Sequence, residues 1–157
     1  MMSRLLKFFS LPRREKQLFC EAGILLLLSN LSVKAVPFRH IDSFLRARAH
    51  WHDIAACPFS TADEIELIKL SLSRVTKLLP WESLCLSRSI AEFIMFRRRG
   101  IPAVMYVGAR FSENSSLVAH AWVCTGREAT NVNLDNSTYT PLVIIGQEQT
   151  SKRFIES

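Results

Sequence analysis

The chain has 157 residues, of which 48% are hydrophobic and 22% are charged. These values fit one globular domain, or one domain with a helical extension, and exclude a wholly disordered chain. The net charge of +6 would suit an acidic partner, but the basic residues lack the interleaved aromatic and glycine residues of base-stacking modules, so we expect no nucleic-acid binding.

The first predicted helix covers Arg13 to Leu31. Pro12 suits its start, and apolar residues follow at near-helical spacing. The most apolar run, Ala22 to Leu28, is much shorter than the roughly 20 residues that span a membrane. The charged Glu21 adjoins it. We therefore expect a buried helix, with no integral membrane span and no signal peptide.

Two more helices are predicted before residue 80. One covers Arg39 to His50, after the break at Pro37. The next begins at Thr61, which forms a capping-box pattern with Glu64, and ends before Pro80. Its apolar face consists of Ile65, Ile68, Leu72 and Val75.

A fourth helix is predicted to start near Glu82 or Ser83 and to stop at Gly100. Three arginines, 97–99, fill its last turn, where positive charge suits the helix dipole. We interpret them as a solvated helix end, with a contact to a peptide as the alternative. The predicted buried stripe consists of Leu86, Ile90, Phe93 and Ile94.

The pattern then changes to short, β-rich runs bounded by turn residues. The sequence therefore predicts an α+β protein with a helical N-terminal part, 1–79, and a second part, 80–157. The second part would place the fourth helix on a small antiparallel sheet of about four strands. These strands are expected at 103–110, 118–124, 128–134 and 142–145.

The four cysteines are Cys20, Cys57, Cys85 and Cys124, and no two of them form a CxxC pair. This spacing argues against a zinc ribbon or a thioredoxin-type site, so we expect no metal and no cofactor. We interpret Cys20 and Cys124 as small apolar filler.

Cys85 is the candidate nucleophile, because it falls in the first turn of the fourth helix. Unpaired backbone N–H groups and the positive end of the dipole favour a thiolate there, and the same groups can donate to an oxyanion. His120, in the second predicted strand, is the candidate base. The plain alternatives are a buried cysteine and a satisfied edge histidine. Trp122 shares the predicted face of His120 and would either wall a substrate cleft or fill core.

The imidazole also needs an acceptor that orients it. If Thr125 and Gly126 form a two-residue turn, Asn131 lies opposite His120 with Cβ atoms about 5 Å apart. Asn133 is then diagonal, and a four-residue turn exchanges the two asparagines. Asp135 lies roughly 13 Å further along the strand and reaches His120 only with a longer turn or a bulge. We rank Asn131 first and Asp135 second.

The motifs in this region resemble the leader peptidases of lasso-peptide biosynthesis, which are cysteine proteases with a transglutaminase/papain-like core. The resemblance extends through Arg127 and fades beyond it. In this family an aspartate usually follows the Gly-Arg of the hairpin, whereas here Asn131 fills or adjoins that position. The matching segments are Cys85–Ser89, Arg97–Pro102, Val107–Arg110 and His120–Val123.

The resemblance implies that Cys85 is the nucleophile and His120 the base of a cytoplasmic leader peptidase. It implies cleavage of a ribosomally made precursor peptide at the leader–core junction. A separate leader-recognition protein and an ATP-dependent lasso cyclase would be its partners. The alternatives are acyl transfer to an amine and a non-catalytic scaffold of the maturation complex.

Overall fold

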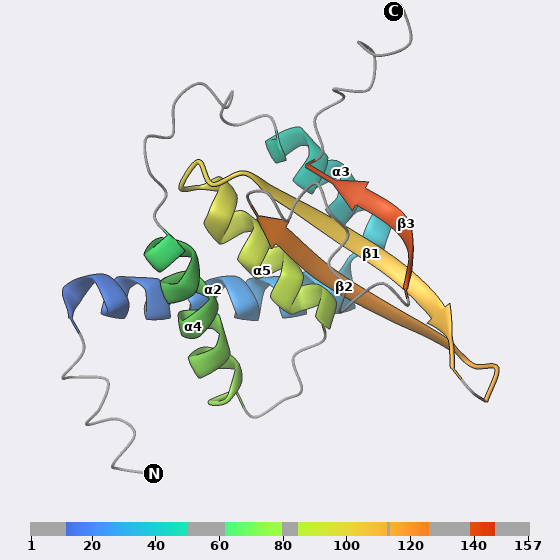
Figure 1. Cartoon of the computed structure of the whole chain (residues 1–157), viewed down its shortest axis with the longest axis horizontal. Coiled ribbons are helices and arrows are strands. Elements are labelled where there is room, and N and C mark those ends of the chain that lie inside the picture. The colour runs from blue at the N-terminus through green and yellow to red at the C-terminus, as the bar shows by residue number, and fades with distance from the viewer. Residues whose placement is uncertain (1–11, 50–61, 80–84, 113, 126–138, 147–157) are drawn as a thin grey trace, which may run out of the picture.

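The computed structural model describes residues 12–49, 62–79, 85–112, 114–125 and 139–146. Within these ranges the chain forms helices first and strands afterwards (Figure 1), in agreement with the predicted α+β class. The elements are α2 (Arg13–Ala35), α3 (Phe38–Ala49), α4 (Ala62–Thr76), α5 (Cys85–Arg97), β1 (Ala103–Phe111), β2 (Leu117–Thr125) and β3 (Thr140–Ile145).

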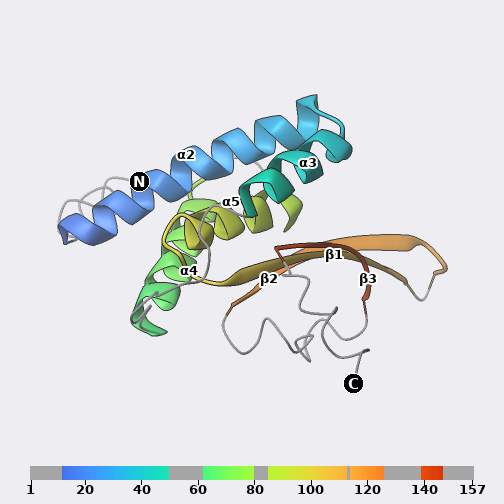
Figure 2. The same ribbon diagram turned by 90° about the horizontal axis from the view of Figure 1, so that it is seen from above.

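The described helices lie on one side of the sheet. Figure 2 shows α5 between α2 and the strands, with α3 beside it. The helix α4 packs against both α2 and α5, while α5 contacts both β1 and β2. Because α5 is covered on one side by helices and on the other by the sheet, it is the central element of the core.

The three described strands form an antiparallel sheet in the order β2-β1-β3. The β1–β2 pair runs without interruption from Ala103↔Thr125 to Phe111↔Leu117. The β1–β3 pair shifts register between Val107 and Gly108. The fourth predicted strand, 128–134, lies outside the described residues.

The ends of the described helices follow the sequence signals. The helix α2 begins directly after Pro12 but continues past the predicted Leu31 to Ala35. Gly100 has φ 69° and ends α5. The Ile101 amide donates to the Phe96 carbonyl at 3.0 Å, and the Gly100 amide donates to a carbonyl in the last turn. This pair of bonds is a Schellman motif, which explains why glycine stops the helix there. Thr61 and its predicted cap lie outside the described residues.

The sequence led us to expect a buried helix, but α2 is buried on only one face. Its inner face, which includes Leu18, Ala22 and Leu26, is buried. Its outer face exposes four large apolar side chains, and Cys20, predicted as filler, is also exposed. The reason is that α4 and α5 cover only the inner face. The four exposed residues are Ile24, Leu27, Leu28 and Leu31.

By length and composition α2 could also cross a membrane. Its most apolar window has a hydropathy of 1.5, and 28% of that window is buried inside the protein. The core helix of a soluble protein passes the same test. Because α2 packs on α4 and α5, we treat it as part of the fold.

The proposed boundary between residues 79 and 80 stays a prediction.

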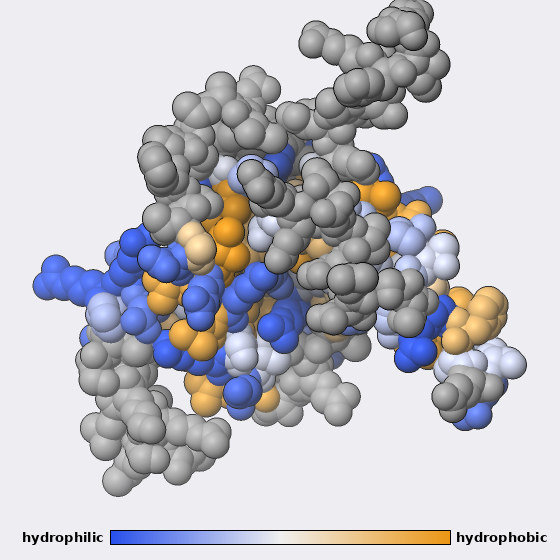
Figure 3. Space-filling view, in the orientation of Figure 1, coloured by the Kyte–Doolittle hydropathy of each residue, from blue (hydrophilic) through white to orange (hydrophobic). Residues whose placement is uncertain are grey.

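The β1–β2 hairpin carries exposed apolar side chains at its free end. Phe111 and Leu117 pair across the two strands and are 75% and 66% exposed. Figure 3 shows apolar surface at this end of the hairpin, away from the helices.

Candidate active site

Cys85 is the first residue of α5, where the sequence predicted it near the helix start, and its side chain is half-buried. Ser87, in the same turn, is fully buried, and its hydroxyl has no hydrogen-bond partner among the described residues. The Cys85 thiol therefore lies on the more exposed side of the first turn of α5, and the side of that turn that carries Ser87 is buried in the core.

The buried surface of α5 is wider than the predicted stripe. Ile90 and Phe93 are buried as expected, whereas Leu86 and Ile94 are only half-buried. Packing on α2 and α4 as well as on the sheet explains the difference. The further buried residues of α5 are Ser87, Ser89, Ala91, Met95 and Phe96.

The side chains of β2 alternate between two clusters, as its period-two pattern predicted. Ala121 belongs to the main core with α5, and Val123 packs against that core. Trp122 and Cys124 belong to a second cluster on the other face. His120 stacks with Trp122 on that second face, so its side chain lies on the side of the sheet that faces away from α5.

His120 is surrounded by aromatic rings. Its ring centroid lies 5.9 Å from that of Trp122, with 15° between the planes, and 5.2 Å from that of Tyr139. Tyr106 also stacks on Trp122, with 5.4 Å between the two ring centroids. The Arg110 guanidinium lies 5.1 Å from the Tyr139 centroid. Trp122 and Tyr139 thus place aromatic rings on two sides of the imidazole.

Gly108 makes room for this aromatic group. It pairs with His120 on β2 and with Pro141 on β3, so it lies between them in the sheet. A Cβ atom at Gly108 would be 3.1 Å from Cη2 of Trp122 and 2.7 Å from the backbone oxygen of Thr140. Glycine therefore lets the indole approach the strand closely.

Trp122 is 6% exposed, and its Nε1 has no hydrogen-bond partner among the described residues. Burial raises the pKa of the neighbouring Tyr106 phenol, and the thiol of Cys124 acts in the same direction. The aromatic face is thus an apolar setting for the imidazole. Sequence reasoning missed Tyr106, Tyr139 and Arg110, because the strand order brings them into the aromatic group around His120.

Cys85 and His120 lie on two elements that contact each other. Figure 1 shows α5 crossing β2 obliquely, with the first turn of α5 at the outer edge of that strand. Within the described ranges, no hydrogen bond joins the Cys85 thiol to the imidazole. Asn131, Asn133 and Asp135, the candidates for the orienting acceptor, lie outside the described residues, and so does Cys57.

The arginines at the end of α5 are not simply solvated, which corrects the first interpretation. Arg98 Nη1 lies 3.1 Å from Glu21 Oε1, and Arg99 pairs with the other oxygen of the same carboxylate. Arg99 also donates to the Met95 carbonyl at 2.9 Å. Since Glu21 belongs to α2, these ion pairs join the end of α5 to α2.

A family model described as the transglutaminase-like superfamily matches residues 28–144. The chain belongs to the transglutaminase-like superfamily. The match covers α5, β1, β2 and all but the last residue of β3, and therefore both Cys85 and His120. No curated protein and no solved structure matched the chain. Membership supports chemistry of the cysteine-protease or acyl-transferase type.

Proposed function

We propose that the protein is a cysteine endopeptidase in which Cys85 is the nucleophile and His120 the base. The observation that carries the proposal is the placement of Cys85 as the first residue of α5, a helix that packs on the strand bearing His120. The first turn of a helix offers unpaired N–H groups. Those groups can stabilise a thiolate and the oxyanion of a tetrahedral intermediate.

The position of β2 determines how the Cys85 thiol and the His120 imidazole can meet. His120 stands on the face away from α5, and β2 is an edge strand of the described sheet. The first turn of α5 lies at that edge. The proposed pair therefore requires the Cys85 thiol and the His120 imidazole to meet around the edge of β2. Because Trp122 and Tyr139 lie beside the imidazole, the Cys85 thiol would reach His120 from the edge of the sheet.

The proposed reaction is acyl transfer in two halves. His120 takes the proton of the Cys85 thiol, and the thiolate attacks the scissile carbonyl. The amide C–N bond then breaks, the proton on His120 goes to the leaving amine, and a thioester on Cys85 remains. Water, deprotonated by His120, attacks the thioester and releases the carboxylic acid and the free thiol. Asn131, or else Asp135, would accept a hydrogen bond from the other ring nitrogen.

The substrate that we propose is the precursor of a lasso peptide, cut between leader and core in the cytoplasm. This assignment rests on the motifs around Cys85 and His120 rather than on the fold. A separate leader-recognition protein would deliver the precursor, and an ATP-dependent cyclase would use the released core amine. Trp122, which is 6% exposed and stacks with His120, would support the imidazole.

The test is a cleavage assay with purified protein and candidate precursor, with and without the leader-recognition protein, read by mass spectrometry. Wild type should give leader and core fragments, and Cys85→Ala and His120→Ala should give neither while remaining folded. Cleavage by Cys85→Ala would remove the proposal. Comparing Asn131→Ala with Asp135→Ala identifies the orienting residue, because only its loss should stop turnover.

Acyl transfer to an amine is the second candidate, favoured by membership of the transglutaminase-like superfamily. In the same assay it predicts a mass increase on an added amine acceptor without net hydrolysis. A non-catalytic scaffold is the third candidate, favoured by the absence of a thiol–imidazole hydrogen bond among the described residues. It predicts no turnover by wild type and a complex with precursor and cyclase that Cys85→Ala leaves unchanged.

A further inference from the structure

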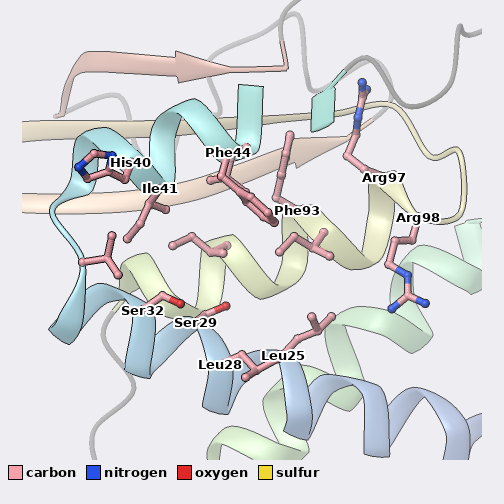
Figure 4. Close-up of a pocket in the computed structure, with 14 residues that line it drawn as sticks. Leu25, Leu28, Ser29, Ser32, His40, Ile41, Phe44, Phe93, Arg97 and Arg98 are labelled. Atoms are coloured by element: carbon pink, nitrogen blue, oxygen red, sulfur yellow. The ribbon is translucent and has the colours of Figure 1, made fainter. Parts of the chain in front are cut away.

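A cleft of 740 Å³ lies between α2, α3 and α5. It shares no residue with the aromatic group around His120, so it is a separate feature of the fold. Its volume is in the range of clefts that bind ligands or several side chains of a partner. Figure 4 shows the two walls, with α2 on one side and α3 on the other, and α5 between them.

The walls of the cleft are mainly apolar. Leu25 and Leu28 come from α2, Ile41 and Phe44 from α3, and Phe93 from α5. Leu28 and Phe44 are 53% and 47% exposed, so the apolar surface is open to solvent. An open apolar cleft of this kind is a feature of interaction sites.

The charge in the cleft is positive at one end. Arg97 and Arg98 lie there, and His40 lies at the other end (Figure 4). Among the described residues that line the cleft there is no aspartate or glutamate. Glu21 nearby is already shared between Arg98 and Arg99. Because Arg97 and Arg98 both line this end of the cleft, it is complementary to an acidic ligand.

The outer face of α2 extends the cleft. Leu28 belongs both to the cleft and to the exposed apolar stripe of α2. The stripe follows the i, i+3, i+4, i+7 spacing of one helix face, and its exposed fractions are 60% for Ile24, 43% for Leu27, 53% for Leu28 and 55% for Leu31. Such a row of side chains is shaped to lie along another helix.

We propose that the cleft and the stripe together bind an amphipathic helical segment of a partner protein. Its apolar side chains would enter the cleft beside Leu28, and its acidic residues would lie at Arg97 and Arg98. A lipid surface would also meet apolar and basic groups, but it lies flat on a helix face, whereas this site is a concave cleft bounded by three helices. The proposal does not rest on the proposed peptidase activity.

The test uses a fluorescein-labelled synthetic helix of about 18 residues, long enough to form stable turns. It carries leucines at helical spacing and glutamates at one end, and a matched peptide carries lysines in place of the glutamates. Fluorescence anisotropy with the full chain should show saturable binding of the acidic peptide. The lysine peptide should bind at least about tenfold more weakly, which corresponds to roughly 1.4 kcal/mol.

Substitutions locate the site. Leu28→Glu and, independently, Leu31→Glu should remove binding of the acidic peptide, because both side chains are exposed and their replacement leaves the core intact. Leu142→Glu on β3, where the leucine is 67% exposed, is the matched control and should bind as wild type does. Arg97→Glu should reverse the preference between the two peptides. Circular dichroism checks that each variant is folded.

Three results would overturn the proposal. The first is the absence of saturable binding of the acidic peptide, and the second is equal binding of that peptide by Leu28→Glu and wild type. The third is binding to phosphatidylserine vesicles that Leu28→Glu removes, without peptide binding, which would assign the surface to a membrane.

Discussion

His120 lies directly opposite Gly108 in the β1–β2 pair, and the missing side chain of Gly108 leaves the space that the indole of Trp122 occupies. The imidazole then stacks on that indole. The orientation of the candidate base thus depends on a residue that carries no side chain.

Gly108→Ala should destabilise the protein by about 1–3 kcal/mol, the usual cost of overpacking. The new methyl group would meet the Thr140 carbonyl oxygen at 2.7 Å, and a backbone atom cannot easily move away. Urea unfolding measures the change. Gly23→Ala is the control, because its methyl group meets only Val75 Cγ1 at 3.9 Å. Within α2 it should stabilise by about 0.5–1 kcal/mol. Equal stability of Gly108→Ala and wild type would contradict the packing described.

Glu92 gives a pH-dependent prediction. Burial raises the pKa of its carboxyl group, although Lys69 and Arg88 act in the opposite direction. In the unfolded chain the group ionises near pH 4.3, roughly its reference value. Because the folded pKa is the higher one, the contribution of Glu92 to stability is fully present below the unfolded pKa. It is lost as pH rises through the folded pKa.

Glu92→Gln should therefore raise the free energy of unfolding at pH 7, by an amount on the order of 1 kcal/mol, and the gain should vanish below the unfolded pKa. Thermal unfolding at several pH values measures it. Glu66→Gln, at an exposed position of α4, is the control and should change the free energy of unfolding at pH 7 by less than about 0.5 kcal/mol. A constant difference between Glu92→Gln and wild type at all pH values would count against the assignment.

Glu21 should matter more for stability than Glu15. Its side chain is 18% exposed and pairs with both Arg98 and Arg99. Glu21→Gln removes the charge of a mostly buried carboxylate that two arginines share, and the pair of Arg99 with Glu64, at 3.9 Å, is longer. We therefore expect a loss of about 1–3 kcal/mol. Glu15→Gln breaks the pair with Arg74, which is 40% exposed, and should cost less than about 1 kcal/mol. Unfolding by urea compares the two. Equal losses would show that the end of α5 is not fixed by Glu21.

The sequence allowed the described helices and strands to be predicted, because local signals mark them. Pro12 marks the start of α2, and Gly100 the end of α5. Side chains that alternate along β2 with a period of two separate its two faces. Such signals act within a few residues, so they do not depend on the rest of the fold.

What the sequence could not predict depends on distant partners. Arg99 and Glu21 are 78 residues apart, and no local pattern joins them. Tyr139 reaches His120 only because β3 pairs with the far side of β1. The exposed side of α2 likewise depends on which helices cover it. At the candidate site, the sequence placed Cys85 and His120 on the correct elements, while the aromatic surroundings of His120 required the strand order.

The most direct measurement of the central claim is covalent labelling by a peptide chloromethyl ketone that carries the residues before the precursor's cleavage site. Peptide mapping by mass spectrometry then locates the adduct among the four cysteines. We predict one adduct on Cys85 in wild type and its loss in His120→Ala. An adduct that favours the exposed Cys20, or labelling of Cys85 that His120→Ala leaves unchanged, would contradict a Cys85–His120 active site.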